Sequence, residues 1–173
     1  MSGTEPLIAP LSLSNVLTVL CALLCLWTAS PQAGGGVWRL WRLTTPGAFA
    51  AVVSLMLLAG VFDATWQHDA EWLVALLLGS LAGRMRGWTL PVEIDQQWGL
   101  VRLPAAKDVL LAGAGVVVLS AIDFTSAAID MALLDPQHTA AGAALLAGFL
   151  ACRALAIIVR SSRGPHVGLR DAA

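Results

Sequence analysis

Two cysteines lie one helical turn apart in the first apolar stretch of the chain. Cys21 and Cys25 stand at i and i+4, so a helix places both thiols on one face, as in a copper or redox site. The spacing differs from Cys-x-x-Cys, however, and no cluster of His or Met stands near it. We therefore interpret the pair as packing residues, and a membrane thiol or metal handler stays open as one alternative function.

Two histidines are accompanied by carboxylates. His68 precedes Asp69 and Glu71, and His138 follows Asp135, and these residue types bind divalent metals. Their spacing matches no metal-binding motif, so we interpret them as solvated loop residues. The sequence predicts neither a metal site nor another cofactor.

Three ionisable residues lie inside apolar stretches or at their edges: Asp63, Asp123 and Arg153. Such residues are functional candidates by default, because a charge inside a bilayer is costly. Arg153 lies two helical turns before Arg160, near the end of the last apolar stretch. Its long side chain is therefore expected to reach the membrane interface by snorkelling.

Asp63 and Asp123 close two apolar stretches at the same predicted boundary. A negative charge is disfavoured at the C-terminus of a helix, so another group should hold or hydrate each carboxylate. Ser120, Ser126 and Asp130 form a polar stripe with Asp123 at helical spacing. This stripe suggests an outward-facing wet crevice that binds a cation, whereas the simpler interpretation is that both acids mark the water interface.

The chain carries no recognisable enzyme motif. It has no P-loop, no Gly-x-Ser-x-Gly and no His-Glu-x-x-His sequence. Its basic residues form no patch of the kind that binds nucleic acid. We therefore predict no catalytic residues, no enzyme activity and no nucleic-acid partner.

The elements that must position these residues are membrane helices. Of the 173 residues, 58% are hydrophobic and 12% are charged, whereas a soluble domain carries about 25% charged residues. No charged residue lies between Glu5 and Arg39, and a spanning helix needs about 20 apolar residues. The lipid bilayer is thus a predicted partner.

Abundant Ala and a preference for Arg over Lys indicate the GC-rich genome of a bacterium.

Five apolar stretches predict an all-α membrane protein with about five transmembrane helices. The predicted spans are 11–29, 47–65, 72–87, 105–124 and 139–159, within a single transmembrane domain over residues 1–163. Pro31 is expected to end the first helix, and Pro136 is expected to break the pattern before the fifth. Residues 164–173 are predicted to be a disordered tail.

The polar interval between the third and fourth spans predicts a short β-hairpin over residues 90–103, because its apolar residues alternate with period two. Gly99 is expected to take the positive φ that a four-residue loop often requires. The resulting register pairs Glu93 with Arg102, Ile94 with Val101 and Val92 with Leu103. One face of the hairpin is therefore apolar, and the other carries an ion pair.

Two further segments have packing or anchoring patterns. Gly79 and Gly83 form a small-xxx-small face that lets a neighbouring helix of the same chain approach closely. Residues 38–42, Trp-Arg-Leu-Trp-Arg, predict an anchor along the inner membrane interface, since Trp prefers the headgroup level and Arg the cytoplasmic side. Lipid recognition by this segment is the alternative, although its two arginines are fewer than the usual cluster of about four to eight.

The basic residues fall in alternate loops. Two lie between the first and second spans, four in the hairpin region, and four from Arg153 onward. The positive-inside rule then places the N-terminus outside, and the hairpin and C-terminus in the cytoplasm. The predicted location is the bacterial inner membrane, crossed several times.

Part of this arrangement resembles a known family. A short span ending in Gly79-Ser80-Leu81-Ala82-Gly83-Arg84 is followed by a polar hairpin, another span, and a last helix that runs from Cys152-Arg153-Ala154-Leu155 through Arg160. This order, over residues 73–163, resembles the small bacterial CcdC-like membrane proteins. The resemblance implies a membrane protein with a nominal link to cytochrome c biogenesis, and it brings no catalytic residue with it.

These features favour a non-enzymatic accessory or assembly component of the inner membrane, with other membrane proteins as further partners. A small transporter or permeation subunit is the first alternative. A transporter needs a polar path across the bilayer midplane, and the candidates for such a path are Asn15, Thr18 and Arg153. The thiol or metal handler is the second alternative, and it requires accessible Cys21 and Cys25.

Overall fold

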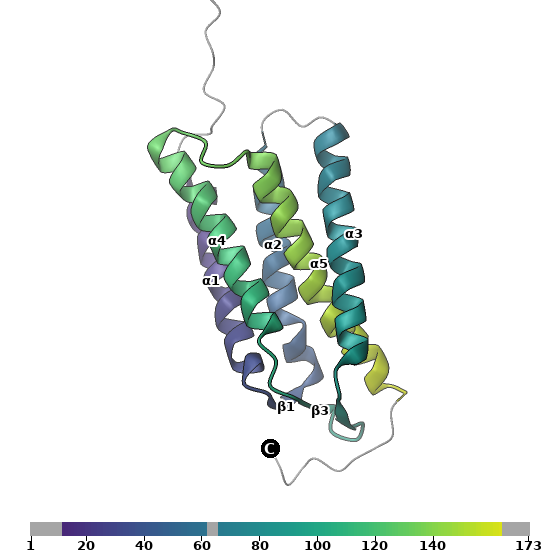
Figure 1. The fold of residues 1–173 in the computed structure, drawn as a ribbon. Coiled ribbons are helices and arrows are strands. Elements are labelled where there is room, and N and C mark those ends of the chain that lie inside the picture. Colours follow the sequence, from purple (N-terminus) through teal and green to yellow (C-terminus); the bar gives the residue numbers. More distant parts are fainter. Residues whose placement is uncertain (1–11, 62–65, 164–173) are drawn as a thin grey trace, which may run out of the picture.

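The structure, a computed structural model, describes residues 12–61 and 66–163. It is a bundle of helices with a small β-sheet across one end (Figure 1). The helices are α1 (Leu13–Ala33), η1 (Leu40–Leu43, a 3-10 helix), α2 (Thr45–Ala59), α3 (Trp66–Thr89), α4 (Asp108–Ile129) and α5 (Pro136–Ser161). The strands are β1 (Gly36–Arg39), β2 (Glu93–Asp95) and β3 (Leu100–Leu103). Below, the end that carries the strands is the sheet end, and the opposite end is the distal end.

Four helical segments of the described residues are long and apolar enough to cross a membrane. They are Leu13–Ala33, Leu40–Ala59, Asp108–Ile129 and Pro136–Ser161. The third predicted span, 72–87, lies in α3, which is 24 residues long but is not among the four. Its two ends are charged, with Asp69 and Glu71 near the start and Arg84 and Arg86 near the finish. The described part thus has four candidate spans rather than the predicted five.

The first helix is longer than predicted because it continues through Pro31. Proline has no amide hydrogen, so the carbonyl of Trp27, four residues earlier, loses its usual helical partner. The hydroxyl of Ser30 donates to this carbonyl at 3.1 Å, and α1 ends only at Ala33. The prediction that Pro31 ends the helix was therefore wrong.

The boundary between α2 and α3 also differs from the prediction. The second span was expected to reach residue 65, but α2 ends at Ala59. α3 then begins at Trp66, so the acidic segment that was assigned to a loop forms its first turns. Acidic side chains are favourable there because they face the positive end of the helix dipole. Asp63 lies outside the described residues.

The last two helices meet at a short distal connection. α4 begins at Asp108 and continues to Ile129, beyond the predicted end at residue 124. α5 begins at Pro136, which initiates the helix instead of breaking the pattern. Proline fits the first helical position, where its missing amide would be unpaired in any case. The Asp135 carboxylate caps this helix by accepting from the amide of Gln137 at 3.1 Å. The predicted tail, 164–173, lies outside the described residues.

The predicted hairpin is present as β2 and β3. The two strands are antiparallel, and Glu93 faces Arg102 while Ile94 faces Val101, as the sequence predicted. The ion pair across the strands is formed, with Arg102 Nη1 2.9 Å from Glu93 Oε2. Ile94, Val101 and Leu103 of this hairpin are buried, which gives it the apolar face that the sequence predicted. Val92 precedes β2, so the third predicted pair lies outside the strands.

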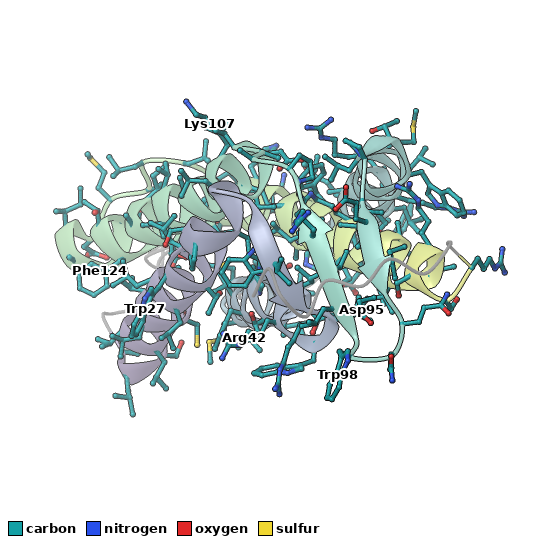
Figure 2. All side chains as sticks on the ribbon, turned by 90° about the horizontal axis from the view of Figure 1, so that it is seen from below. Trp27, Arg42, Asp95, Trp98, Lys107 and Phe124 are labelled. Atoms are coloured by element: carbon teal, nitrogen blue, oxygen red, sulfur yellow. The ribbon has the colours of Figure 1, made fainter. Side chains whose placement is uncertain are left out.

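A third strand extends this hairpin into a sheet. β1 pairs antiparallel with β3, so that Trp38 faces Val101 and Arg39 faces Leu100, and the strand order is β1-β3-β2. Figure 2, which views the molecule from the sheet end, shows the strands lying across the ends of the helices. Of residues 38–42, the predicted interfacial anchor, the first two belong to β1 and the rest to η1.

Two apolar clusters hold the fold together. The larger one fills the bundle with small and branched side chains from α1, α2, α4 and α5, among them Ala22, Val53, Val116 and Ala147. The smaller one lies beneath the sheet, where Ile94, Val101, Leu103 and Ile157 pack together with residues of η1 and α5. The sheet thus covers the end of the bundle with its apolar face.

The close helix contact predicted at Gly79 and Gly83 is made within the chain, between α3 and α5. A Cβ at Gly79 would overlap the carbonyl of Leu145, and a Cβ at Gly83 would overlap that of Phe149. Gly148 of α5 makes the same kind of close contact with α3, since a Cβ there would overlap the carbonyl of Leu76. Only glycine allows these two backbones to approach so closely.

Replacing Gly99 with Ala should destabilise the hairpin by about 1 kcal/mol, because Gly99 has a φ of +60° that a Cβ disfavours. A Cβ at this position meets no atom within 4 Å, so the cost is conformational and not steric. Limited proteolysis of the loop should be about fivefold faster in this variant. The control is Gln97→Ala, at an exposed position of the same loop. Equal rates for the two variants would contradict the proposed turn.

Candidate functional site

A polar cavity opens at the distal end between α1, α2, α4 and α5. Its volume is about 70 Å³, which is enough for more than one water molecule. The polar side chains that line it come from α1, from α4, from the start of α5 and from the residue before α1: Ser12, Ser14, Asn15, Thr18, Asp123, Ser126 and Thr139. We call this cavity the distal pocket.

Asp123 supplies the charge of the distal pocket. Its Oδ2 accepts a hydrogen bond from Asn15 Nδ2 at 3.2 Å. The amide of Asn15 is held in turn by Ser12, whose hydroxyl and backbone amide donate to Asn15 Oδ1 at 2.7 and 3.0 Å. Because Ser12 is the N-cap of α1 and Asn15 lies in its first turn, the cap of one helix orients the donor for a carboxylate on another.

The contact with Asn15 shows which group holds the Asp123 carboxylate, as the sequence analysis had required. The carboxylate lies near the C-terminal end of α4, where the dipole of its own helix disfavours it. It faces the first turn of α1 instead, at the positive end of that helix, and it accepts a hydrogen bond there. The predicted holding group thus exists, and it is Asn15.

The polar stripe of α4 is only partly directed into the distal pocket. Ser126 lines it, donates to the carbonyl of Ile122 and accepts from the amide of Leu133. Ser120 is buried elsewhere in the bundle, and its hydroxyl has no partner among the described residues. Asp130 is exposed and forms the left-handed C-cap of α4, with a φ of 51°. The crevice therefore contains two of the four predicted residues.

The chemistry available in the distal pocket is that of a small oxygen-rich site. One carboxylate, several hydroxyl oxygens and an amide suit a hydrated cation or an ammonium group. Within the described residues, no group of three or more His, Cys, Asp and Glu side chains is placed to hold a metal ion. The pocket is thus suited to a weakly held cation rather than to a structural metal.

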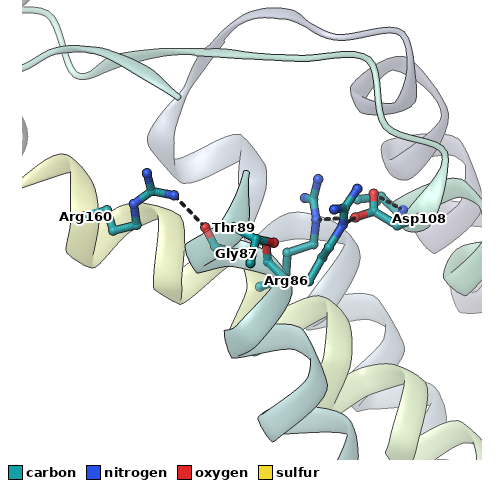
Figure 3. Close-up of polar contacts among 7 residues, drawn as sticks. Arg86, Gly87, Thr89, Asp108 and Arg160 are labelled. Carbon is teal, nitrogen blue, oxygen red and sulfur yellow. Dashed lines mark hydrogen bonds and ion pairs between the residues drawn. The ribbon is translucent and has the colours of Figure 1, made fainter. Parts of the chain in front are cut away.

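A second polar cluster lies at the sheet end and joins three helices. Arg86 Nε of α3 and Arg153 Nε of α5 both contact Asp108 Oδ2 of α4, at 2.7 and 3.2 Å. Figure 3 shows the Asp108 carboxylate receiving its contacts from the neighbouring guanidinium groups. The other carboxylate oxygen, Oδ1, accepts from the amide of Val109 at 2.8 Å. We call Arg86, Asp108 and Arg153 the Asp108 cluster.

Arg153 does not snorkel to the interface as predicted. Its side chain is only 5% exposed, whereas that of Arg86 is 44% exposed. The reason is that Asp108 lies within reach of Arg153 and compensates its charge inside the protein. Sequence reasoning missed Asp108, although a charge inside an apolar stretch requires a partner and an acid begins the preceding helix.

Arg160, also at the sheet end, caps the C-terminus of α3. Its Nη1 donates to the carbonyls of Gly87 and Leu90 at 2.9 and 2.7 Å, and the first of these contacts appears in Figure 3. Its guanidinium also lies 5.9 Å from the ring of Trp88. Because the last carbonyls of a helix carry a partial negative charge, this arginine stabilises the end of α3.

The histidines and the thiols do not form a site within the described residues. His138 Nε2 lies 3.6 Å from Glu71 Oε1, which joins the starts of α3 and α5, but Asp135 is engaged in capping α5. Cys25 is fully buried, and its thiol contacts the carbonyl oxygen of Pro46 at 3.3 Å. A thiol handler would need this group to be accessible, so the geometry disfavours that alternative.

Comparison of the chain with known protein families, with curated proteins and with solved structures found no match. The resemblance to CcdC-like membrane proteins therefore stays a prediction.

Proposed function

We propose that the chain is a five-span protein of the bacterial inner membrane that acts as a non-enzymatic accessory or assembly component. The observation that carries this proposal is the distribution of polar groups along the bundle. The distal pocket and the Asp108 cluster lie at opposite ends, and the apolar cluster around Val53 and Val116 fills the space between them. Such a bundle is suited to holding or binding, because apolar side chains of the described residues separate the two polar sites.

The surface of α3 supports its assignment as a membrane span in addition to the four candidate spans. Its outward face carries large apolar side chains that are about half exposed: Leu73, Val74, Leu77, Leu78, Leu81 and Met85. A continuous apolar face of this kind is unfavourable in water and well matched to lipid. A helix of 24 residues is about 36 Å long, which exceeds the roughly 30 Å of a hydrocarbon core.

The charge distribution supports an orientation with the sheet end in the cytoplasm. The described basic residues belong to the half of the bundle nearest the sheet: Arg39, Arg42, Arg84, Arg86, Arg102, Lys107, Arg153, Arg160 and Arg163. The described acids of the distal half are Asp69, Glu71, Asp123, Asp130 and Asp135. Under the positive-inside rule this segregation favours an N-terminus outside and a C-terminus in the cytoplasm.

Cysteine labelling in intact cells tests this orientation. In a background without the three native cysteines, Gln67→Cys and Gln137→Cys should react with a membrane-impermeant maleimide added from outside. Gln97→Cys, in the hairpin loop, should react only after lysis. Labelling of Gln97→Cys in intact cells would contradict the N-out orientation, and failure at Gln67→Cys alone would contradict α3 as a span.

The distal pocket favours a second candidate function, a small transporter or permeation subunit. A half-buried carboxylate oriented by Asn15 is a reasonable first binding site for a cation that arrives from outside. Passage across the membrane would then require the apolar cluster beneath the pocket to open. We consider binding without passage to be the better-supported role.

Two measurements separate these functions. In the first, the purified protein is reconstituted in liposomes, and the efflux of Na⁺, K⁺ and protons is compared with that of protein-free vesicles. No difference is expected for an accessory component. In the second, the intact protein is purified in mild detergent and examined for a membrane protein that copurifies in a fixed ratio.

Flux that the wild type supports and Asp123→Asn abolishes would overturn the accessory role in favour of transport. A matched control for the pocket is Asp130→Asn, because Asp130 is an exposed acid of the same helix outside the pocket. The absence of both flux and any fixed-ratio partner would contradict both candidates.

A further inference from the structure

The distal pocket contains a carboxylate that has no cationic partner among the described residues. Asp123 forms no ion pair with them, and its Oδ2 accepts a hydrogen bond from the neutral amide of Asn15. The described basic residues belong to the half of the bundle nearest the sheet, at the other end of the molecule. The positive end of the α1 dipole compensates about half of one charge. The carboxylate is thus suited to a cation that enters the pocket from outside the protein.

Three buried hydroxyl groups of the distal pocket offer lone pairs rather than hydrogens. Thr18, Ser126 and Thr139 line the pocket and are 3%, 8% and 2% exposed. Each hydroxyl donates its hydrogen to a backbone carbonyl three or four residues earlier in its own helix, at 2.7 to 2.8 Å. A hydroxyl has one hydrogen and two lone pairs, so each of the three can accept a further hydrogen bond, including Ser126, which already accepts one from the amide of Leu133. This set of acceptors selects a ligand that donates.

The polar side chains of the distal pocket come from α1, α4, α5 and the N-cap of α1, whereas α2 contributes an apolar wall with Met56 and Leu57. Ca²⁺ surrounds itself with about six to eight oxygens and Mg²⁺ with about six, so an apolar wall suits neither ion. A primary ammonium group has three N–H donors at one end and carbon at the other, which matches a lining of this kind. The volume of about 70 Å³ limits such a ligand to a few heavy atoms.

We propose that the distal pocket binds the primary ammonium group of a small amine, with Asp123 as its counter-ion and the hydroxyl oxygens of Ser126 and Thr139 as further acceptors. The alkyl part of the amine lies against Leu57. Asn15 is a positioning residue, because it holds the carboxylate that receives the ammonium group. This inference rests on the proposed function and deepens it, since it names the ligand class for the pocket where binding without passage was proposed.

Thermal unfolding of the purified full-length protein in detergent tests this site, because a ligand that binds the folded state raises the Tm. Propylammonium chloride is titrated in a buffer free of other amines, and tetramethylammonium chloride, a cation without N–H groups, keeps the ionic strength constant. The comparison probes are 1-propanol, which has the same carbon chain and no charge, and the chlorides of sodium and potassium. We expect propylammonium to raise the Tm and each comparison probe to leave it unchanged.

Two variants test the charge and the size of the distal pocket separately. Asp123→Asn should raise the Kd for propylammonium at least about tenfold, because it removes a hydrogen bond between two charged groups. Asp130→Asn is the matched control, and it should leave this Kd unchanged, since Asp130 is an exposed acid of the same helix outside the pocket. Ala127→Leu narrows the pocket without changing any charge, and it should weaken the binding of propylammonium more than that of methylammonium.

Several results would overturn the amine site. An equal rise in Tm with sodium or potassium would assign the pocket to a metal ion, and an equal rise with 1-propanol would assign it to an apolar group. Unchanged propylammonium binding in Asp123→Asn, or no rise in the Tm of the wild type with this amine, would also contradict the proposal. The probe series on the wild type and Ala127→Leu keep the test valid if Asp123→Asn fails to fold. Flux and copurification test the accessory role independently, so either proposal can fail while the other stands.

Discussion

Replacing Asp108 with Asn is expected to destabilise the protein by about 3 kcal/mol, because it leaves the buried guanidinium of Arg153 without a carboxylate. The side chain of Arg153 is 5% exposed, and its only ion pair among the described residues is the one at 3.2 Å to Asp108. Asn keeps the shape and one acceptor oxygen of the Asp side chain. The loss of stability therefore reports the removal of the negative charge alone. Equilibrium unfolding in mixed detergent micelles measures the difference.

Two further variants test whether the burial of the Arg153 charge causes this loss of stability. Arg86 contacts the same carboxylate oxygen from an exposed position, so Arg86→Gln should cost less than about 1 kcal/mol. Adding Arg153→Met to Asp108→Asn removes the uncompensated charge, and the double variant should be more stable than Asp108→Asn alone. Equal losses for Asp108→Asn and Arg86→Gln, or a double variant that loses the sum of both single losses, would contradict a compensated buried charge.

The Asp108 cluster also shows where sequence reasoning ends. The position of Arg153 inside an apolar stretch was evident, and so was the cost of a charge there. The sequence analysis predicted snorkelling, and pairing with an acid is the other solution; the choice between them depends on which helix lies beside α5. Asp108 is 45 residues away along the chain, and only the packing of α4 brings the two side chains together. The sequence pattern around Arg153 carries no information on which helix packs beside it.

In the sheet, too, the pairing of neighbouring strands was predictable from the sequence, and the pairing with a distant strand was not. The register of β2 and β3 follows from a short loop and an alternating pattern, and Glu93 and Arg102 pair as predicted. β1 joins β3 from more than sixty residues earlier in the chain, and its four residues are too few for a pattern. The sequence signal for β1 is the glycine at position 35. Gly35 has a φ of +77°, and a Cβ there would lie 2.8 Å from the amide nitrogen of Ala105. The glycine run Gly34-Gly35-Gly36 thus marks a close approach of two backbones.

The distal pocket was predictable from one side only. The stripe of α4 indicated that Asp123 would face a polar space, because the spacing of its residues fixes a common helix face. The other wall comes from the first turn of α1, and Asn15 lies 108 residues from Asp123. Asn15 had been noted only as a candidate for a polar path across the bilayer midplane. Its role as a partner of Asp123 required the arrangement of the bundle.

Replacing Gly83 with Ala is expected to destabilise the protein by about 2 kcal/mol, even though Ala is the better helix former. A Cβ at Gly83 would overlap the carbonyl and Cα of Phe149, and these backbone atoms cannot rotate away as a side chain can. α3 and α5 must therefore separate, and the neighbouring contact at Gly79 weakens with them. Equilibrium unfolding in mixed micelles measures the loss.

Gly142→Ala is the matched control for this variant, since it makes the same substitution in a helix of the same bundle. A Cβ at Gly142 would lie 3.0 Å from Leu119 Cδ1, which is the flexible end of a side chain that has room to adjust. The same gain in helix propensity should then leave Gly142→Ala neutral or slightly stabilised. If Gly83→Ala proves as harmless as Gly142→Ala, the backbones of α3 and α5 are further apart than the structure places them. Because α3 contributes much of its packing through this one face, such a result would also weaken its assignment as an additional membrane span.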